Sequence, residues 1–209
     1  MPYGLERWSL SLKGRVGVLG GTFNPIHNGH LLIAEAALRE YELSLVLFVP
    51  NAIPPGSKKP LRPGKEDRFR MVQLAVADDP RLEVSRIEVD RGGPSYTIDT
   101  IRALKEDYRH GISFIVGADC LAQIDRWKEP DAIIASVPLI VAPRTGVAPS
   151  SLDRKLFDEG SIWPLDMPEV DLSSTVLRER IRRGESIVDS VPSCVAAYIA
   201  EYGLYRDAE

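Results

Sequence analysis

The chain has 209 residues, with 26 basic and 30 acidic side chains, a net charge of −4 and a pI near 5.5. This balance argues against a general nucleic-acid binder, whose domain is normally basic with a clustered positive face. No run approaches the roughly 18 apolar residues of a membrane span, and residues 1–12 lack the apolar core of a signal peptide. We therefore expect a cytoplasmic protein without nucleic-acid or membrane partners.

The first third of the chain alternates apolar runs with breaks. Short apolar runs rich in β-branched residues predict strands buried on both faces. Five prolines between Pro50 and Gly64 exclude a regular element there, and long loops inside compact domains are usually functional. The expected elements are a strand at Val16–Leu19, a helix from His30 to about Tyr41, a strand at Leu45–Val49 and a loop at 50–64.

The rest of the chain continues this alternation, with little pattern between Thr145 and Asp158. The expected helices are Lys65–Ala77, Tyr96–Tyr108, Ser174–Arg183 and Val191–Tyr202. The expected strands are Leu82–Val89, Ile112–Val116, Leu139–Ala142 and Ser161–Leu165. Strands that alternate with helices in this way predict an α/β fold, in which a Rossmann-like parallel sheet carries helices on both faces.

The length fits one domain. We expect it to cover residues 15–209 after an N-terminal extension at 1–14, with a small helical part at 173–209. In parallel α/β folds, ligands bind beyond the carboxyl ends of the strands, where the strand order reverses. This rule points to the residues after Leu19, Val49 and Val116.

A motif suited to phosphate directly follows the first expected strand. Gly20 and Gly21 let the backbone approach a ligand, and the next helix offers unpaired N–H groups at its positive end. His27 and His30 lie three positions apart at that end, which suits both imidazoles to donate to a polyphosphate. One alternative is zinc, but no nearby side chains complete a ligand set. The other is that the histidines merely cap or pack the helix.

A second motif opens the helix expected near the other end of the chain. Hydroxyls and amides at Ser173, Ser174 and Thr175 are suited to hold a phosphate, while Arg178 reaches the same anion one turn later. An ordinary Ser or Thr N-cap explains this sequence equally well when it is considered alone. Beside the histidine motif in an α/β chain, the phosphate interpretation is favoured.

Together these residues resemble the bacterial nicotinate-nucleotide adenylyltransferase family, part of the nucleotidylyltransferase superfamily that carries (H/T)xGH and late SSTxxR motifs. The resemblance runs from about Val16 to Tyr202. The segments that look like the family's substrate-side and GAD…WK motifs are Pro94–Thr100 and Phe114–Asp119 followed by Trp127-Lys128. The departures from its pattern are Asn24 for an aspartate, Cys120 for a serine, and Pro54–Lys59 where many relatives read Pro-Pro-His-Lys.

The resemblance implies that AMP passes from ATP to the 5′-phosphate of nicotinate mononucleotide, with deamido-NAD and pyrophosphate as products in NAD biosynthesis. Such a reaction needs no protein nucleophile, so catalysis consists of positioning and charge stabilisation. His27, His30 and Arg178 are the expected catalytic residues. Mg²⁺ is expected to enter on the ATP phosphates, without a metal site in the protein.

The resemblance also implies two sets of binding residues. Those expected to bind ATP are Gly20, Gly21, Thr22, Phe23, His27, His30, Gly117, Asp119, Ser173, Ser174, Thr175 and Arg178. Those expected to bind the acceptor are Tyr96, Thr97, Asp119, Trp127, Lys58 and Lys59. Trp127 is expected to stack on the pyridine ring, with core packing as an equal alternative. Most charges between Lys58 and Arg70 are expected on a solvated helix face, with one lysine recruited to phosphate.

Other functions stay open at this point. A related transferase would act on nicotinamide mononucleotide, phosphopantetheine or a polyol phosphate, although a pantetheine arm offers no ring for Trp127. A non-catalytic nucleotide sensor with the same fold is a different class, but it has no need of His27, His30 and Arg178. The sequence leaves a homo-oligomer open. The two cysteines make no CxxC pair, so we expect two buried thiols and no disulfide framework.

Overall fold

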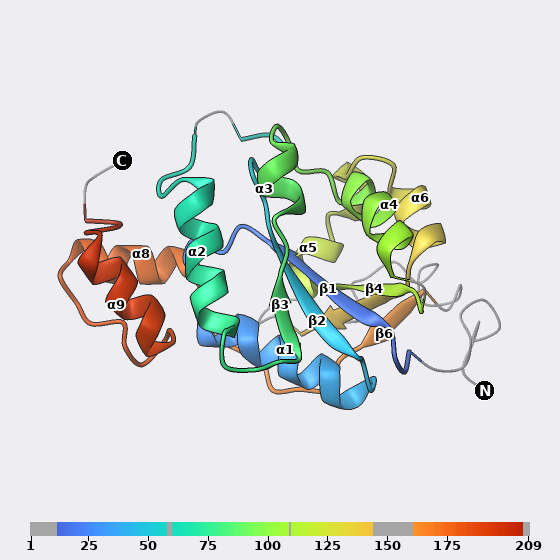
Figure 1. Ribbon diagram of the computed structural model, residues 1–209, viewed down its shortest axis with the longest axis horizontal. Coiled ribbons are helices and arrows are strands. Elements are labelled where there is room, and N and C mark those ends of the chain that lie inside the picture. Colours follow the sequence, from blue (N-terminus) through green and yellow to red (C-terminus); the bar gives the residue numbers. More distant parts are fainter. Residues whose placement is uncertain (1–11, 58–59, 109, 144–160, 207–209) are drawn as a thin grey trace. The chain divides into compact units, whose positions relative to one another are not determined.

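The computed structural model describes residues 12–57, 60–108, 110–143 and 161–206, and its elements follow the expected alternation (Figure 1). Six strands form one sheet in the order β3-β2-β1-β4-β5-β6. The pairs β1/β4, β4/β5 and β5/β6 are parallel. The strands are β1 (Val16–Gly21), β2 (Leu45–Pro50), β3 (Leu82–Val84), β4 (Ile112–Gly117), β5 (Leu139–Ala142) and β6 (Ile162–Pro164). The predicted fold class is confirmed.

The helices lie between these strands and after the last of them. They are α1 (Asn28–Glu40), α2 (Lys65–Val76), α3 (Ile87–Arg91), α4 (Thr97–Asp107), α5 (Ala118–Leu121), α6 (Pro130–Ser136), α8 (Ser174–Arg182) and α9 (Ser193–Glu201), with a 3₁₀ helix η1 (Ile124–Arg126). All five predicted helices are present, with ends that agree within two residues. The predicted loop after β2 also has no helix or strand among its described residues, apart from an isolated bridge between Ile53 and Pro94.

One local prediction of secondary structure was wrong. The strand expected over Leu82–Val89 ends at Val84, and the chain then forms the short helix α3. Its apolar residues Ile87 and Val89 suit the alternation of a strand, but the structure places them on a helical turn. The helices between residues 118 and 136 were also not predicted. The patternless segment at 145–158 lies outside the described residues.

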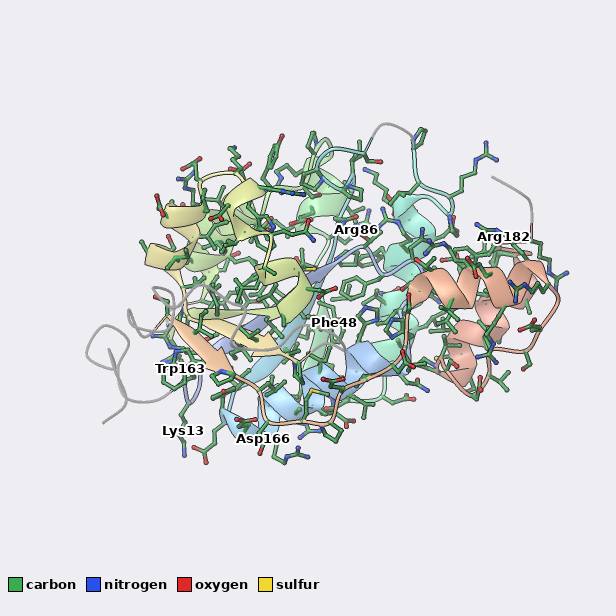
Figure 2. All side chains as sticks on the ribbon, turned by 180° about the vertical axis from the view of Figure 1, so that it is seen from behind. Lys13, Phe48, Arg86, Trp163, Asp166 and Arg182 are labelled. Atoms are coloured by element: carbon green, nitrogen blue, oxygen red, sulfur yellow. The ribbon has the colours of Figure 1, made fainter. Side chains whose placement is uncertain are left out.

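The chain packs as two compact units, each built from three stretches of sequence. The first unit comprises Met1–Gly20, Ile33–Leu47 and Tyr96–Asp171. Its core includes Ile115 and Ile140, which are completely buried on neighbouring strands. Figure 1 shows α1 on one side of the strands, and α4 with α6 on the other. At its edge, Trp163 of β6 packs edge-on against Tyr41, with ring centroids 5.8 Å apart (Figure 2).

The second unit comprises Gly21–Leu32, Phe48–Ser95 and Leu172–Glu209. Its central helix α2 packs against β3 and α9. The Tyr198 hydroxyl of α9 donates to Asp67 Oδ1 at 3.0 Å, and Cys194 Sγ donates to the Leu74 carbonyl at 3.4 Å. Cys194 is half-buried and Cys120 is exposed, so the expectation of two buried thiols was wrong. No helix in the described parts of the chain is long and apolar enough to cross a membrane.

Candidate active site

The strand order reverses between β1 and β4, which places their carboxyl ends side by side in the first unit. Gly20 follows β1 residue Leu19, and Gly117 ends β4. A Cβ on Gly117 would lie 2.6 Å from Asp119 Oδ1, and one on Gly20 would lie 3.2 Å from the Phe114 ring. Glycine therefore keeps the backbone open at the sheet edge where parallel α/β folds bind their ligands.

The turn after β1 in the second unit is fixed by aromatic packing. Phe23 has a left-handed backbone (φ 46°) that a bulky residue rarely adopts, and its ring is 2% exposed. That ring packs against Phe48, 5.7 Å away between centroids, and edge-on against His30 at 5.0 Å. Figure 2 labels Phe48 in the interior. A Cβ on Gly21 would come within 2.9 Å of the Phe23 ring, so this turn requires glycine there.

The side chain of His30 caps the start of helix α1. His27 precedes the first helical residue, and its backbone N–H donates to His30 Nδ1 at 3.2 Å. The His30 N–H donates in turn to the His27 carbonyl at 2.9 Å. The first of these bonds is one half of a capping box, with the His30 imidazole in the place of the usual Glu or Gln, and the second is a backbone turn. Because Nδ1 accepts a hydrogen bond, neutral His30 carries its proton on Nε2 and presents that N–H as a donor.

The capping alternative and the functional one are therefore compatible. Nδ1 of His30 serves the helix, and Nε2 on the opposite side of the ring can serve a ligand. The two imidazoles stack with centroids 3.7 Å apart and planes 25° apart, which fixes both rings on one side of the helix. His27 is 5% exposed and His30 is half-buried. His110, the third histidine, is exposed.

The late motif at the start of α8 contacts the turn that precedes the histidines. Ser174 Oγ donates to the Pro25 carbonyl at 2.9 Å, and Arg178 Nη1 donates to the Asn24 carbonyl at 2.9 Å. Arg178 Nη2 also donates to Thr175 Oγ1 at 3.3 Å. Ser173 occupies the N-cap position but makes no capping hydrogen bond through its side chain. The second unit thus brings together the two motifs that the sequence separates by more than 140 residues.

Sequence reasoning missed Arg68, which is completely buried. Its Nη1 donates to the Thr22 carbonyl at 2.8 Å and to Asn51 Oδ1 at 3.1 Å, and its Nη2 donates to the Ala52 carbonyl at 3.0 Å. Burial is the largest influence on this group and lowers the pKa of the guanidinium. Arg68 therefore ties the turn after β1 to the loop after β2, whereas the sequence predicted a solvated helix face.

One signal in the sequence could have revealed this arginine. Arg68, Val72 and Val76 follow one another at spacings of four, and all three are buried on α2. A charged residue on the apolar stripe of a helix needs partners in the interior. Arg70 illustrates the usual case, because it is exposed and its guanidinium pairs with Gln73 on the same helix.

Two of the residues expected to bind the acceptor lie at the start of α4 in the first unit, and Asp119 lies in α5 of the same unit. Tyr96 is the N-cap of this helix and Thr97 is its first residue. Lys128 Nζ lies 4.9 Å from the centroid of the Tyr96 ring and donates to both Asp99 carboxylate oxygens at 3.0 Å. The neighbouring Trp127 is half-buried and meets Phe114 edge-on, with centroids 6.4 Å apart. Trp127 is thus not a fully enclosed core residue. Lys58 and Lys59 lie outside the described residues.

Comparison with known proteins shows the family to which this chain belongs. Residues 18–180 match the family described as cytidylyltransferase-like. A protein of Thermoanaerobacter sp. named probable nicotinate-nucleotide adenylyltransferase is 40% identical over 203 residues, which cover 93% of this chain and 96% of that protein. One of the same name from Thermus thermophilus is 42% identical over 193 residues, covering 92% of this chain and all of that protein. The chain belongs to the nicotinate-nucleotide adenylyltransferase family.

Solved structures agree with this family at the level of the fold. The nicotinic acid mononucleotide adenylyltransferase of Plasmodium falciparum, in its complex with NaAD, gives a TM-score of 0.76 at 16% identity, covering 92% of this chain and 97% of that one. Its complex with APC gives 0.73 at the same identity and coverage. The resemblance to this family is confirmed, and the two motifs and the intermediate segments on which it was based all lie within the matched residues 18–180.

Proposed function

We propose that this chain transfers AMP from ATP to the 5′-phosphate of nicotinate mononucleotide, forming deamido-NAD and pyrophosphate in NAD biosynthesis. The observation that carries the proposal is the cluster of His27, His30 and Arg178 around the turn at Asn24-Pro25. It occurs in a chain whose full-length relatives are named for this activity. The cluster carries the positive charge of Arg178 and several hydrogen-bond donors, as transfer between phosphates requires.

The chemistry needs no covalent intermediate with the protein. An oxygen of the acceptor phosphate forms a bond to the α-phosphorus of ATP, and the bond from that phosphorus to the bridging oxygen of pyrophosphate breaks. The charge that develops on these oxygens is stabilised by the Nε2–H donor of His30, the guanidinium of Arg178 and the positive end of the α1 dipole. Within the described residues Arg178 Nε is buried without a hydrogen-bond partner, and neither Arg178 nor Arg68 forms an ion pair.

Magnesium fits this scheme as a companion of ATP. The described residues contain no group of three or more His, Cys, Asp or Glu side chains arranged to hold a metal ion. Mg²⁺ commonly binds through substrate phosphates and water rather than through a cage of protein ligands. When bound on ATP, it would neutralise part of the triphosphate charge. The protein residues would then contact phosphate oxygens that the ion leaves open.

The acceptor side is assigned to Thr97 and Trp127 of the first unit. The Thr97 backbone amide lies at the N-terminus of α4, where the helix dipole favours a carboxylate such as that of nicotinate. The indole of Trp127 offers a face to an electron-poor pyridine ring. A cytoplasmic location and the absence of nucleic-acid partners belong to the same proposal.

The decisive experiment compares two acceptors. Purified protein is incubated with ATP, Mg²⁺ and either nicotinate mononucleotide or its amide counterpart, and pyrophosphate release is followed. We expect release with both ATP and the acid present, at a rate well above that with the amide. Equal rates would refute the acid preference. No release with either acceptor would refute the transferase and favour a nucleotide sensor.

A further inference from the structure

Asn24 is the residue of the turn after β1 that contacts Arg178 in the second unit. It is 7% exposed, and its carbonyl accepts the hydrogen bond from Arg178 Nη1 at 2.9 Å. Its side chain is held separately, because Oδ1 accepts from the Tyr205 hydroxyl at 2.8 Å. Nδ2 donates to the Arg62 carbonyl at 3.5 Å. The residue that positions Arg178 is thus itself positioned by Tyr205.

The backbone after α9 is shaped to deliver Tyr205 to this place. Gly203 adopts a left-handed conformation (φ 61°) just after the helix. Its N–H donates to the Ala200 carbonyl at 3.3 Å, and the Leu204 N–H donates to the Ile199 carbonyl at 3.0 Å. These two bonds form a Schellman motif, which ends the helix and turns the chain sharply. Tyr205 follows, also with a positive φ of 67°, so its conformation is unusual for a residue with a side chain.

The surroundings of the Tyr205 phenol keep it neutral and able to donate. Burial raises its pKa above the ordinary tyrosine value, and the nearby charges of Arg178 and Arg68 oppose that shift only in part. A neutral phenol keeps the O–H that it needs to donate a hydrogen bond. Asn24 Oδ1 is the acceptor of that bond, at 2.8 Å.

We propose that Tyr205 is a positioning residue for adenylyl transfer, which acts by holding Asn24 so that the Asn24 carbonyl orients the Arg178 guanidinium. This inference rests on the proposed function, because Arg178 matters only where an anion must be stabilised. Loss of the hydroxyl leaves the phenyl ring, so the fold is kept while the Asn24 turn loses one of its two anchors. Arg178 then reaches its working orientation in a smaller fraction of molecules.

The test is Tyr205→Phe, with Tyr198→Phe as the matched control. Both substitutions remove one hydroxyl hydrogen bond near the end of the chain, but Tyr198 donates to Asp67 at 3.0 Å and not to the Asn24 turn. We expect Tyr205→Phe to lower kcat by about 3- to 10-fold, the factor that one neutral hydrogen bond is worth, with little change in KM for nicotinate mononucleotide. We expect Tyr198→Phe to lower the melting temperature at least as much and to leave kcat unchanged.

A double-mutant cycle separates positioning from a general loss of stability. If Tyr205 acts through Arg178, Tyr205→Phe has no further effect on kcat once Arg178 is alanine. An undiminished effect in the Arg178→Ala background overturns the proposal, and so does a Tyr205→Phe enzyme with wild-type kcat. An equal fall in kcat for Tyr198→Phe also overturns it. If the wild-type chain releases no pyrophosphate at all, the proposed function fails instead, so the two failures are distinguishable.

Discussion

We expect His30 to cap helix α1 through one ring nitrogen and to bind phosphate through the other. Two substitutions of His30 distinguish these roles. Nδ1 accepts the His27 N–H at the start of α1, whereas Nε2 is the donor assigned to phosphate. Asparagine places Oδ1 where Nδ1 lies but has no group at the Nε2 position. Alanine has neither. His30→Asn therefore keeps the cap and loses the donor, while His30→Ala loses both.

The expected magnitudes follow from these two groups. Removal of one donor to a developing anion typically lowers kcat by about 100- to 1000-fold, so both variants should lose activity to that extent. Loss of a helix cap costs about 1 kcal/mol, which corresponds to roughly 2–4 °C in the melting temperature for a chain of this size. Only His30→Ala should show that loss. Steady-state pyrophosphate release and thermal unfolding of the same samples measure the two effects.

The comparison needs a correction for helix propensity. Alanine is the better helix former by up to about 0.7 kcal/mol, which partly hides the loss of the cap. The same two substitutions at Leu32, which is 47% exposed on the same helix, measure that difference directly. After this correction, an alanine variant as stable as the asparagine variant would refute the assignment of Nδ1 to the cap. An asparagine variant with near wild-type kcat would refute the assignment of Nε2 to the reaction.

Three further predictions concern other parts of the chain. Arg68→Met should lower the free energy of unfolding in urea by about 2–5 kcal/mol, because it strands buried acceptors, whereas the exposed Arg70→Met should change it by less than about 0.5 kcal/mol. Trp127→Leu should raise KM for nicotinate mononucleotide by about 3- to 10-fold while KM for ATP stays constant, and an equal rise in both would contradict ring stacking. Burial, together with the Asp67 hydrogen bond, raises the pKa of Tyr198 to about 12. The folded chain thus holds this proton more tightly than the unfolded one, and the stabilisation is lost as pH rises from about 10 to 12. Thermal unfolding over that range should show a shallower decline for Tyr198→Phe than for the wild type.

The sequence was informative where structure is decided locally. The runs at Val16–Leu19 and Leu139–Ala142 became buried strands because continuous apolar residues suit a sheet covered on both faces. The segment after Val84 was predicted as a strand but forms the helix α3, because three or four residues of alternation fit a strand and a helical turn almost equally well. Pro130 opens α6 at a position where a missing N–H costs nothing, so the same proline suited a turn or a helix start.

The same distinction between local and long-range structure applies to the residues of the candidate site. His27, His30 and Arg178 were predictable because each belongs to a short motif at a helix start. Arg68 and Tyr205 were not, because their partners are backbone carbonyls and an amide that only the folded chain brings near. A backbone carbonyl has no signature in the sequence, so the partners of these two residues are known only from the folded structure, although the spacing of Arg68 with Val72 and Val76 could have indicated that Arg68 is buried.

The contact between Arg178 and Asn24 also carries a consequence for synthesis of the protein. Its two residues are 154 positions apart, and a ribosome adds about 5–20 residues each second. The turn that carries the histidines therefore emerges roughly 8–30 s before the arginine that holds it. During that interval the second unit lacks its last stretch, residues 172–209. The nascent chain thus carries the histidine motif long before Arg178 can contact the Asn24 turn, and premature termination anywhere before α8 yields a chain without this contact.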